Sequence, residues 1–248
     1  MKVIAIINQK GGTGKTTTTI NLGSALAKEW KKVLVIDLDP QGNLGYSLGV
    51  LESEYSMAEV LLGEKHLEDI LVNAEGMALA PSNNHLVDAE LTLATSSDRE
   101  HVLSRILKGE RGYDFILIDC PPSLSILTLN ALLAADEVII PMQMEVLSLQ
   151  GLDQIVNTIN KVKSAFSKKL KIAGILPVMV DSRRKLSHEV HDYISENYSI
   201  PIFESYIRAN VKASEAPSFG KSVVAYKPKS SSAMDYKNFA SEFLKLNS

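Results

Sequence analysis

The sequence predicts an α/β fold, a mostly parallel twisted sheet with helices on both faces, from three observations. Short β-branched apolar runs alternate with segments of helical apolar spacing along almost the whole chain. Two of these runs end directly on a carboxylate, at Asp37 and at Asp119. The first run leads through a glycine-rich turn into a helix, which is typical of a phosphate-binding loop. Repeated strand-then-helix units favour a parallel sheet, because each crossover helix returns the chain to the same edge.

The expected elements follow along the chain. Strands are expected from short apolar runs, most of them rich in β-branched residues, at residues 3–7, 33–37, 77–80, 115–119, 137–140, 172–179 and 202–203. Helices are expected from apolar residues three or four apart, at residues 17–27, 56–75 (several short ones), 88–93, 99–108, 125–133, 151–166, 185–196 and 232–246. A loop is expected between the second strand and the helices of residues 56–75, through Pro40 and Gly42. With no repeat, linker or low-complexity segment, residues 1–248 are expected to form one domain.

Composition narrows the class of protein. The chain has 248 residues, of which 45% are hydrophobic and 22% charged, as in a globular domain with a large core. Cys120 is the only cysteine, which excludes a disulfide framework, a cysteine zinc site and a four-cysteine cluster. The N-terminal apolar run is too short for a signal peptide, and no apolar stretch reaches membrane-spanning length. A cytoplasmic protein is expected.

Charge is spread unevenly over the two halves of the chain. The net charge is −3, but residues 1–150 hold 11 Lys and Arg against 20 Asp and Glu, whereas residues 151–248 hold 15 against 9. Such asymmetry suggests that the second half supplies a surface for a polyanion. Solvated helix faces would give the same count, so both interpretations stay open at this point.

The glycine-rich turn, Lys10 to Thr17, is the strongest chemical signal. Backbone N–H groups at a strand-to-helix turn attract anions, and glycine lets the chain curl round a phosphate. Lys15 supplies charge for the outer phosphates, and the Thr16 hydroxyl suits Mg²⁺. The usual pattern has a glycine five residues before Gly14; this chain has Gln9 there and a second lysine, Lys10, beside it. The alternatives are a flexible loop and, for Lys10, a merely solvated side chain.

Carboxylates follow two further strands that should meet this turn, because ligands bind beyond the carboxyl ends of parallel strands. Asp119 is expected at the open end of its strand, where it could hold Mg²⁺ directly or through water, or could simply cap the next turn. Asp37 and Asp39 lie two apart and share a face in extended chain. One of them could orient the water that attacks the γ-phosphate, while the other supports the loop or the metal.

Together these motifs resemble the ParA family, also called the deviant Walker ATPases, and within it the Soj-type partition ATPases that lack an N-terminal DNA-recognition domain. Met1 lies just ahead of the first strand, where such a domain would have to fit. The matching segments reach across nearly the whole chain. They are residues 8–17 (NQKGGTGKTT), 37–43 (DLDPQGN), 118–123 (IDCPPS), 127–132 (LTLNAL), 210–211 (NV) and 214–221 (SEAPSFGK).

The resemblance implies an ATP- and Mg²⁺-dependent ATPase that forms a homodimer when ATP is bound, slow alone and quickened by a ParB-like partner protein. It implies that Lys10 reaches the nucleotide of the other subunit, while Lys15 takes the usual lysine role. Asp39 would orient or activate water, and the magnesium side would comprise Thr16, Asp39 and Asp119. The implied nucleotide-binding residues are Lys10, Gly11, Gly12, Thr13, Gly14, Lys15, Thr16 and Thr17, with Met179 and Pro217 packed against adenine.

Non-specific DNA is the second ligand that the resemblance implies, which would make the protein nucleoid-associated. The DNA contacts would come from Arg183, next to Arg184, and from Lys212. A lysine at position 212 keeps the charge of the family's arginine but loses its bidentate fork. Other basic residues could extend the patch: Lys163, Lys168, Lys227 and Lys229.

Other relatives are less well matched. A MinD-like membrane-positioning ATPase would need a basic amphipathic C-terminal helix, whereas residues 235–248 mix acids with few lysines, so no membrane contact is expected. The nitrogenase iron protein requires paired cluster cysteines, and a tyrosine-kinase relative would carry a tyrosine-rich tail. A cobyrinate-type amidase is expected to need an extra substrate domain. Trp30 is expected to pack on the end of the first helix, and Cys120 to be a small buried residue.

Overall fold

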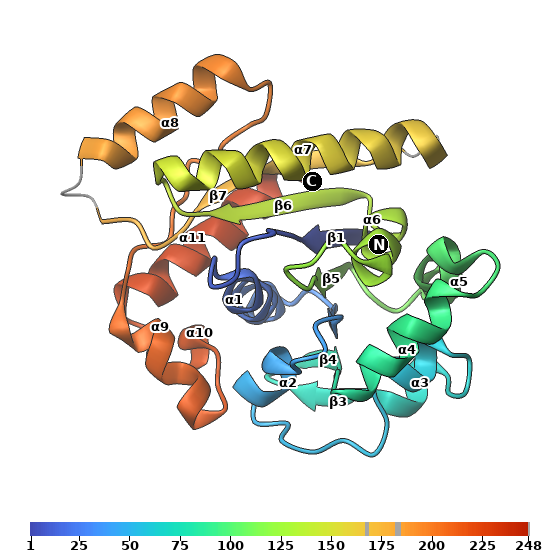
Figure 1. The fold of residues 1–248 in the computed structure, drawn as a ribbon. Helices are drawn as coiled ribbons and strands as arrows, with labels where there is room; N and C mark the ends of the chain where they lie inside the picture. Colours follow the sequence, from blue (N-terminus) through green and yellow to red (C-terminus); the bar gives the residue numbers. More distant parts are fainter. Residues whose placement is uncertain (167–168, 182–184, 248) are drawn as a thin grey trace.

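The structure, a computed structural model, describes residues 1–166, 169–181 and 185–247. In this part of the chain the strands form one seven-stranded sheet in the order β3-β4-β2-β5-β1-β6-β7 (Figure 1). Only the β3–β4 pair is antiparallel; all other neighbours run parallel. The strands are β1 Lys2–Ile6, β2 Val33–Asp37, β3 Val72–Ala74, β4 Met77–Ala80, β5 Phe115–Asp119, β6 Glu137–Met142 and β7 Lys171–Pro177.

Helices cover both faces of this sheet (Figure 1). The α-helices are α1 Lys15–Lys28, α2 Asn43–Ser47, α3 Met57–Leu61, α4 His85–Ala94, α5 Val102–Lys108, α6 Ile126–Ala134, α7 Val146–Phe166, α8 Lys185–Asn197, α9 Val211–Glu215, α10 Val223–Tyr226 and α11 Ser231–Leu246. The 3₁₀ turns are η1 Leu67–Ile70, η2 Arg99–His101 and η3 Ala216–Phe219. The α/β fold with a mostly parallel sheet is therefore confirmed.

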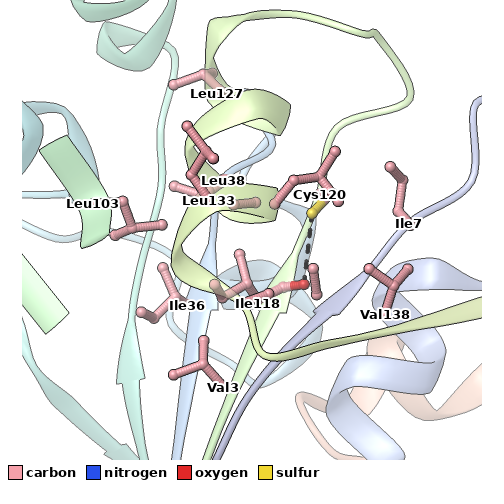
Figure 2. Packing of buried hydrophobic residues seen from close by; sticks show 14 of the residues in the cluster. Val3, Ile7, Ile36, Leu38, Leu103, Ile118, Cys120, Leu127, Leu133 and Val138 are labelled. Atoms are coloured by element: carbon pink, nitrogen blue, oxygen red, sulfur yellow. Dashed lines mark hydrogen bonds between the residues drawn. The ribbon is translucent and has the colours of Figure 1, made fainter. Parts of the chain in front are cut away.

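Two apolar layers hold the sheet between the helices. On one face, α1, α10 and α11 pack around the fully buried rings of Tyr236, Phe239 and Phe243. On the other face, α3 to α8 pack around a second cluster that includes Cys120 (Figure 2). The Cys120 Sγ lies 3.8 Å from the carbonyl oxygen of Ile118 and is fully buried, so the expectation of a small buried residue is confirmed.

The strand register places the candidate functional residues at one edge of the sheet. In the parallel pairs Asp37 lies opposite Asp119, and Asp119 lies opposite Ile6, the last residue of β1. Because β2, β5 and β1 are adjacent, the segments that follow them start side by side. The carboxyl edge of the sheet thus receives the glycine turn and both carboxylate-bearing ends, as the alternation of strands and helices predicts.

The observed elements differ from the expected ones in several places. α7 begins at Val146 instead of residue 151, and Ile202 forms only an isolated bridge with Ile175. The expected loop after β2 contains the short helix α2, and part of the 56–75 segment is the strand β3. In the described residues no helix is both long and apolar enough to cross a bilayer.

Trp30 was expected to pack on the end of the first helix, and that expectation is wrong. Its side chain is 94% exposed, and its backbone has φ of 60°. The N–H of Trp30 donates to the Ala27 carbonyl and that of Lys31 to the Leu26 carbonyl, the pattern of a helix that ends in a left-handed residue. The left-handed turn directs the indole away from α1 instead of along it.

Candidate nucleotide-binding site

The phosphate-loop candidate spans residues 8–14 between β1 and α1. Gly12 and Gly14 have φ of 72° and 77°, left-handed values that glycine adopts without strain. A Cβ built on Gly11 or Gly12 would meet no atom within 4 Å, so the space beside these two glycines is open. Because α1 starts at Lys15, its first backbone N–H groups and the positive end of its dipole face this space. A glycine-rich turn that leads into a helix N-terminus has the backbone donors that a phosphate requires.

Lys15 carries the charge of the loop. The residue is buried, with 7% of its surface exposed, and burial lowers the pKa of its ammonium while Asp119 and Asp39 oppose that shift. Within the described part of the chain no carboxylate forms an ion pair with it. A buried ammonium without a paired anion is costly, which fits a site built to receive a phosphate.

The magnesium-side residues meet at the start of α1. The Thr16 hydroxyl donates to Asp119 Oδ2 at 2.6 Å, and the Thr19 hydroxyl lies 3.4 Å from Asp119 Oδ1. Burial raises the pKa of Asp119 to about 7, against the opposing effects of Thr16 and Lys15. A hydroxyl and a carboxylate of this kind suit Mg²⁺, which takes one or two protein oxygens together with phosphates and water. Thr19 was not among the predicted residues, although its position three after Thr16 on one helix face is a usable signal.

The two aspartates that follow β2 play different parts. Asp37 is fully buried and accepts the backbone N–H groups of Asp39, at 2.9 Å, and of Leu44, at 3.1 Å. Burial, followed by the neighbouring Asp119, raises the pKa of Asp37 well above its usual value. Asp39 is only partly buried, and its Oδ1 accepts the Gln41 N–H at 3.0 Å. Asp37 therefore supports the loop, and Asp39 is the carboxylate that is open to a ligand.

The two lysines of the loop lie in different surroundings. Lys15 is buried, whereas the Lys10 side chain is 44% exposed and its Nζ lies 3.8 Å from Glu145 Oε2. The next two residues, at the start of α7, are apolar and exposed: Val146 at 57% and Leu147 at 79%. Lys10 thus lies at the rim of the site, beside apolar side chains that are exposed to solvent in a single copy of the chain.

The two residues predicted to contact adenine, Met179 and Pro217, lie next to different segments of the chain. Met179, which has a left-handed φ of 54°, lies next to the loop, since its Cε would be 4.0 Å from a Cβ on Gly14. Pro217 belongs to η3, which packs against α2. The structure thus brings Met179 to the phosphate loop and Pro217 to the neighbouring short helix.

Of the predicted DNA contacts, Arg183 and Arg184 lie outside the described residues, as does Lys168. Lys212, on α9, forms an ion pair with Glu215 at 2.8 Å, and that hydrogen bond raises the pKa of the lysine. Lys163, Lys227 and Lys229 are exposed. The acid beside Lys212 was not anticipated, although its i,i+3 spacing could have indicated it.

Comparison with known proteins shows which family the chain resembles. A family model described as an AAA domain matches residues 1–172. The chain is 41% identical to the sporulation initiation inhibitor protein Soj of Bacillus subtilis, over 97% of each protein. It is also 41% identical to the chromosome-partitioning ATPase Soj of Treponema pallidum (98% of this chain, 97% of that one) and to the chromosome partitioning protein ParA of Myxococcus xanthus (98% and 88%).

Solved structures of the same fold cover nearly the whole chain. One is described as cobyrinic acid a,c-diamide synthase from Mycobacterium smegmatis with bound ATP analogue and magnesium; it has a TM-score of 0.88 and 38% identity over 99% of this chain and 95% of that one. The cell division ATPase MinD of Pyrococcus furiosus has a TM-score of 0.83 and 27% identity over 99% of each chain. Because the first of these is matched along nearly its full length, the expectation that such an amidase needs a larger chain is not upheld.

Fold and site together define a P-loop ATPase, with the glycine loop, the buried lysine and the carboxylates gathered at the carboxyl edge of a parallel sheet. Within that class, the identity to the Soj and ParA proteins over almost the entire chain settles the family. The chain belongs to the ParA/Soj family of partition ATPases.

Proposed function

We propose that this protein is a single-domain, ATP-switched DNA-binding protein that positions a plasmid, chromosome or protein cargo. In this proposal Mg²⁺ and ATP join two copies face to face at the carboxyl edge of the sheet. The dimer then binds DNA without sequence preference, and a ParB-like partner stimulates hydrolysis and release. The protein would act in the cytoplasm on the nucleoid.

The placement of Lys10 carries the proposal. Lys15 is buried at the start of α1 whereas Lys10 is exposed, so Lys10 is the lysine available to a phosphate approaching from outside. A phosphate chain with several negative charges can hold lysines from two subunits at once. Val146, Leu147 and Met179 are exposed apolar residues of the same region, and a second copy would cover them.

The proposed reaction assigns a task to each residue. The loop N–H groups and Lys15 hold the phosphates, and Lys10 of the other copy neutralises charge that develops on the transferred phosphoryl group. Bound Mg²⁺ would polarise the outer phosphate oxygens, held on the Thr16 and Asp119 side. Asp39 orients the attacking water and accepts its proton, while Asp37 keeps the backbone of Asp39 in place.

DNA binding is proposed for the basic second half of the chain. The contacts assigned to Arg183, Arg184 and Lys212 go to phosphates, so they should be indifferent to sequence and weakened by salt. Lys212 would have to exchange its Glu215 partner for a DNA phosphate. Because of that exchange, Lys212 should contribute less to DNA affinity than Arg183 and Arg184 do.

The proposal is tested by DNA retention with and without nucleotide. Mg²⁺–ATP should increase retention of unrelated duplexes, and Arg183→Ala and Lys10→Ala should each abolish the increase. Arg111→Ala and Lys108→Ala serve as matched controls, because both side chains are exposed and lie near the opposite edge of the sheet. Retention that ignores ATP, or survives Arg183→Ala, would contradict the proposal.

Two rival functions have distinct readouts. A MinD-like protein would sediment with anionic vesicles in the presence of ATP, independently of Arg183. An amidase like the one named for the Mycobacterium smegmatis structure would consume ATP only when a corrinoid acid and an amide donor are supplied. Stimulation of ATP hydrolysis by DNA-bound partner protein, and not by those substrates, supports the partition function.

A further inference from the structure

The indole of Trp30 makes little contact with the chain that carries it. The indole is 94% exposed, and the residue adopts φ of 60° at a helix end where glycine is the usual residue. A bulky residue in this conformation is unfavourable, because its Cβ crowds the backbone. An exposed tryptophan in a strained conformation is better explained by a partner outside the chain, since tryptophan is among the residues most enriched at the centres of interfaces.

A hollow of about 770 Å³ reaches the residue that follows Trp30 in the sequence, although Trp30 itself is not part of its lining. It is lined by Lys31, the neighbour of Trp30, and by residues at the amino ends of β1, β5, β6 and β7. This is the edge of the sheet opposite the nucleotide loop. The hollow is of a size that accommodates a short peptide segment.

Three lysines of this hollow have no partner in the part of the chain that the structure describes. They are Lys31, Lys169 and Lys171, for which no ion pair or side-chain hydrogen bond is found. The acids of the hollow, by contrast, are engaged: Asp114 accepts the Lys32 N–H at 2.8 Å, Asp136 accepts the Val3 N–H at 2.9 Å, and Glu137 pairs with Lys2 at 2.7 Å. The lining therefore holds four lysines against three acids, and its three lysines without a partner are the groups left to pair with a ligand.

We infer that Trp30 and this hollow form a docking site for an acidic peptide segment of a partner protein, one that carries an apolar or aromatic side chain. Carboxylates of the peptide would pair with Lys31, Lys169 and Lys171, and its apolar residue would cover the indole of Trp30. This combination gives both charge complementarity and a buried aromatic anchor.

Other occupants fit the hollow less well. A DNA duplex and an anionic membrane present continuous negative charge, part of which would have to lie against Asp114, Asp136 and Glu137 in the same lining. A second copy of this chain would bring the same lysines against each other at a two-fold contact. A peptide can place its carboxylates on the lysines and its N–H groups by the acids.

The site is separate from the proposed ATPase switch. It lies at the amino ends of the strands, so a dimer joined through the nucleotide edge would leave it open. Docking is therefore expected with and without nucleotide. Its failure would leave the ATP-switched function untouched.

The single tryptophan gives a direct assay, because Trp30 is the only one in the chain and its emission reports this site alone. The probes are a peptide of alternating Asp and Glu around one Phe, the same peptide with lysines in place of the acids, an oligothymidylate, and vesicles of phosphatidylserine and phosphatidylcholine in equal parts. Saturable change of Trp30 emission with the acidic peptide alone is the expected result. A response only to the oligonucleotide or the vesicles, or no response to any probe, overturns the inference.

Two kinds of variant separate docking from folding. Lys31→Glu with Lys171→Glu should weaken peptide binding by about tenfold or more, whereas Lys237→Glu, in the first half of α11, should not change it. Trp30→Gly, followed by anisotropy of a labelled peptide, should abolish binding and yet raise the melting temperature by about 2–4 °C, because glycine suits the helix end. A lowered melting temperature would assign Trp30 a structural role and contradict the inference.

Discussion

At the scale of single residues, Asp37 and Asp119 lie opposite each other on neighbouring strands, and both side chains are fully buried. Burial is the main cause that raises the pKa of each, in Asp119 to about 7. Without a metal or nucleotide, the folded protein binds protons at these carboxylates more tightly than the unfolded chain does, where the ordinary value is 3.8. The stability that they confer is therefore present at low pH and lost as the pH rises; for Asp119 the loss runs from about 4 through about 7.

This linkage predicts a pH-dependent effect of Asp119→Asn. In nucleotide- and metal-free protein at a pH of about 8, the variant should melt several degrees above the parent, because a neutral amide replaces a desolvated charge. The difference should shrink as the pH is lowered to about 5. Calorimetry over this range measures it. Equal melting temperatures at high pH would show that Asp119 is not destabilised by burial.

Asp39 should matter for hydrolysis and not for binding. Asp39→Ala should lower ATP hydrolysis at least about a hundredfold, the usual effect of losing a general base, while ATP affinity changes little. Phosphate release and titration calorimetry give the two quantities. Asp37→Ala is the contrasting variant, since it removes both oxygens that accept the Asp39 and Leu44 N–H groups and should lower stability. Loss of ATP affinity in Asp39→Ala would assign Asp39 to binding.

The positions of residues with a defined chemical role in phosphate or metal binding could be predicted from the sequence. Lys15, Thr16 and Asp119 meet as their spacing and strand-end positions indicated. The exposed position of Trp30 could not be predicted, because a left-handed helix end is normally indicated by glycine and this chain has tryptophan there. No local pattern shows that such a side chain turns outward.

At the scale of elements, two glycines let the short helices approach. Gly220, at the end of η3, has φ of 62°, and a Cβ on it would lie 2.9 Å from the Cα of Gly49, which follows α2. This contact fastens the segment after the Asp39 loop to the segment that holds Pro217. A side chain at this position would force the two backbones apart.

Gly220→Ala should therefore destabilise the protein more than Gly63→Ala does. Gly63 has a similar left-handed φ of 77°, but a Cβ there meets nothing within 4 Å. The control should cost about 1 kcal/mol for its backbone conformation alone, and Gly220→Ala at least about 2 kcal/mol. Urea denaturation gives both free energies of unfolding. Equal decreases would mean that the Gly49–Gly220 contact can relax freely.

The long elements were predictable and the short ones were not. β2, β4 and β5 have the expected bounds, because each is a buried apolar run with a clear end. α2 and β3 have three to five residues and form through packing on neighbours, so their sequences carry little periodic signal. α7 starts earlier than expected because exposed Val146 and Leu147 lie on its first turn and disturb the apolar spacing.

At the scale of the whole molecule, the excess of basic residues after residue 150 leads to a prediction about salt. If the ATP-bound dimer holds DNA through phosphates, the logarithm of its affinity should fall linearly with the logarithm of salt concentration. Arg183→Ala should reduce that slope by roughly one for each DNA phosphate that the arginine neutralises, equally for all sequences. Filter binding over a salt series measures the slope. A strong sequence preference, or affinity unaffected by salt, would exclude this mode of binding.

In the proposed dimer, Lys10 and Lys15 of one loop contact two different nucleotides, Lys15 that of its own subunit and Lys10 that of the other. Mixing Lys10→Ala with Asp39→Ala protein tests this arrangement directly, because in a mixed dimer one site would combine the Asp39 of one copy with the Lys10 of the other. Each variant alone should be inactive, and the equimolar mixture should recover hydrolysis at up to roughly one site in four. If the mixture stays as inactive as its components, Lys10 acts within its own subunit and the shared-site account is wrong.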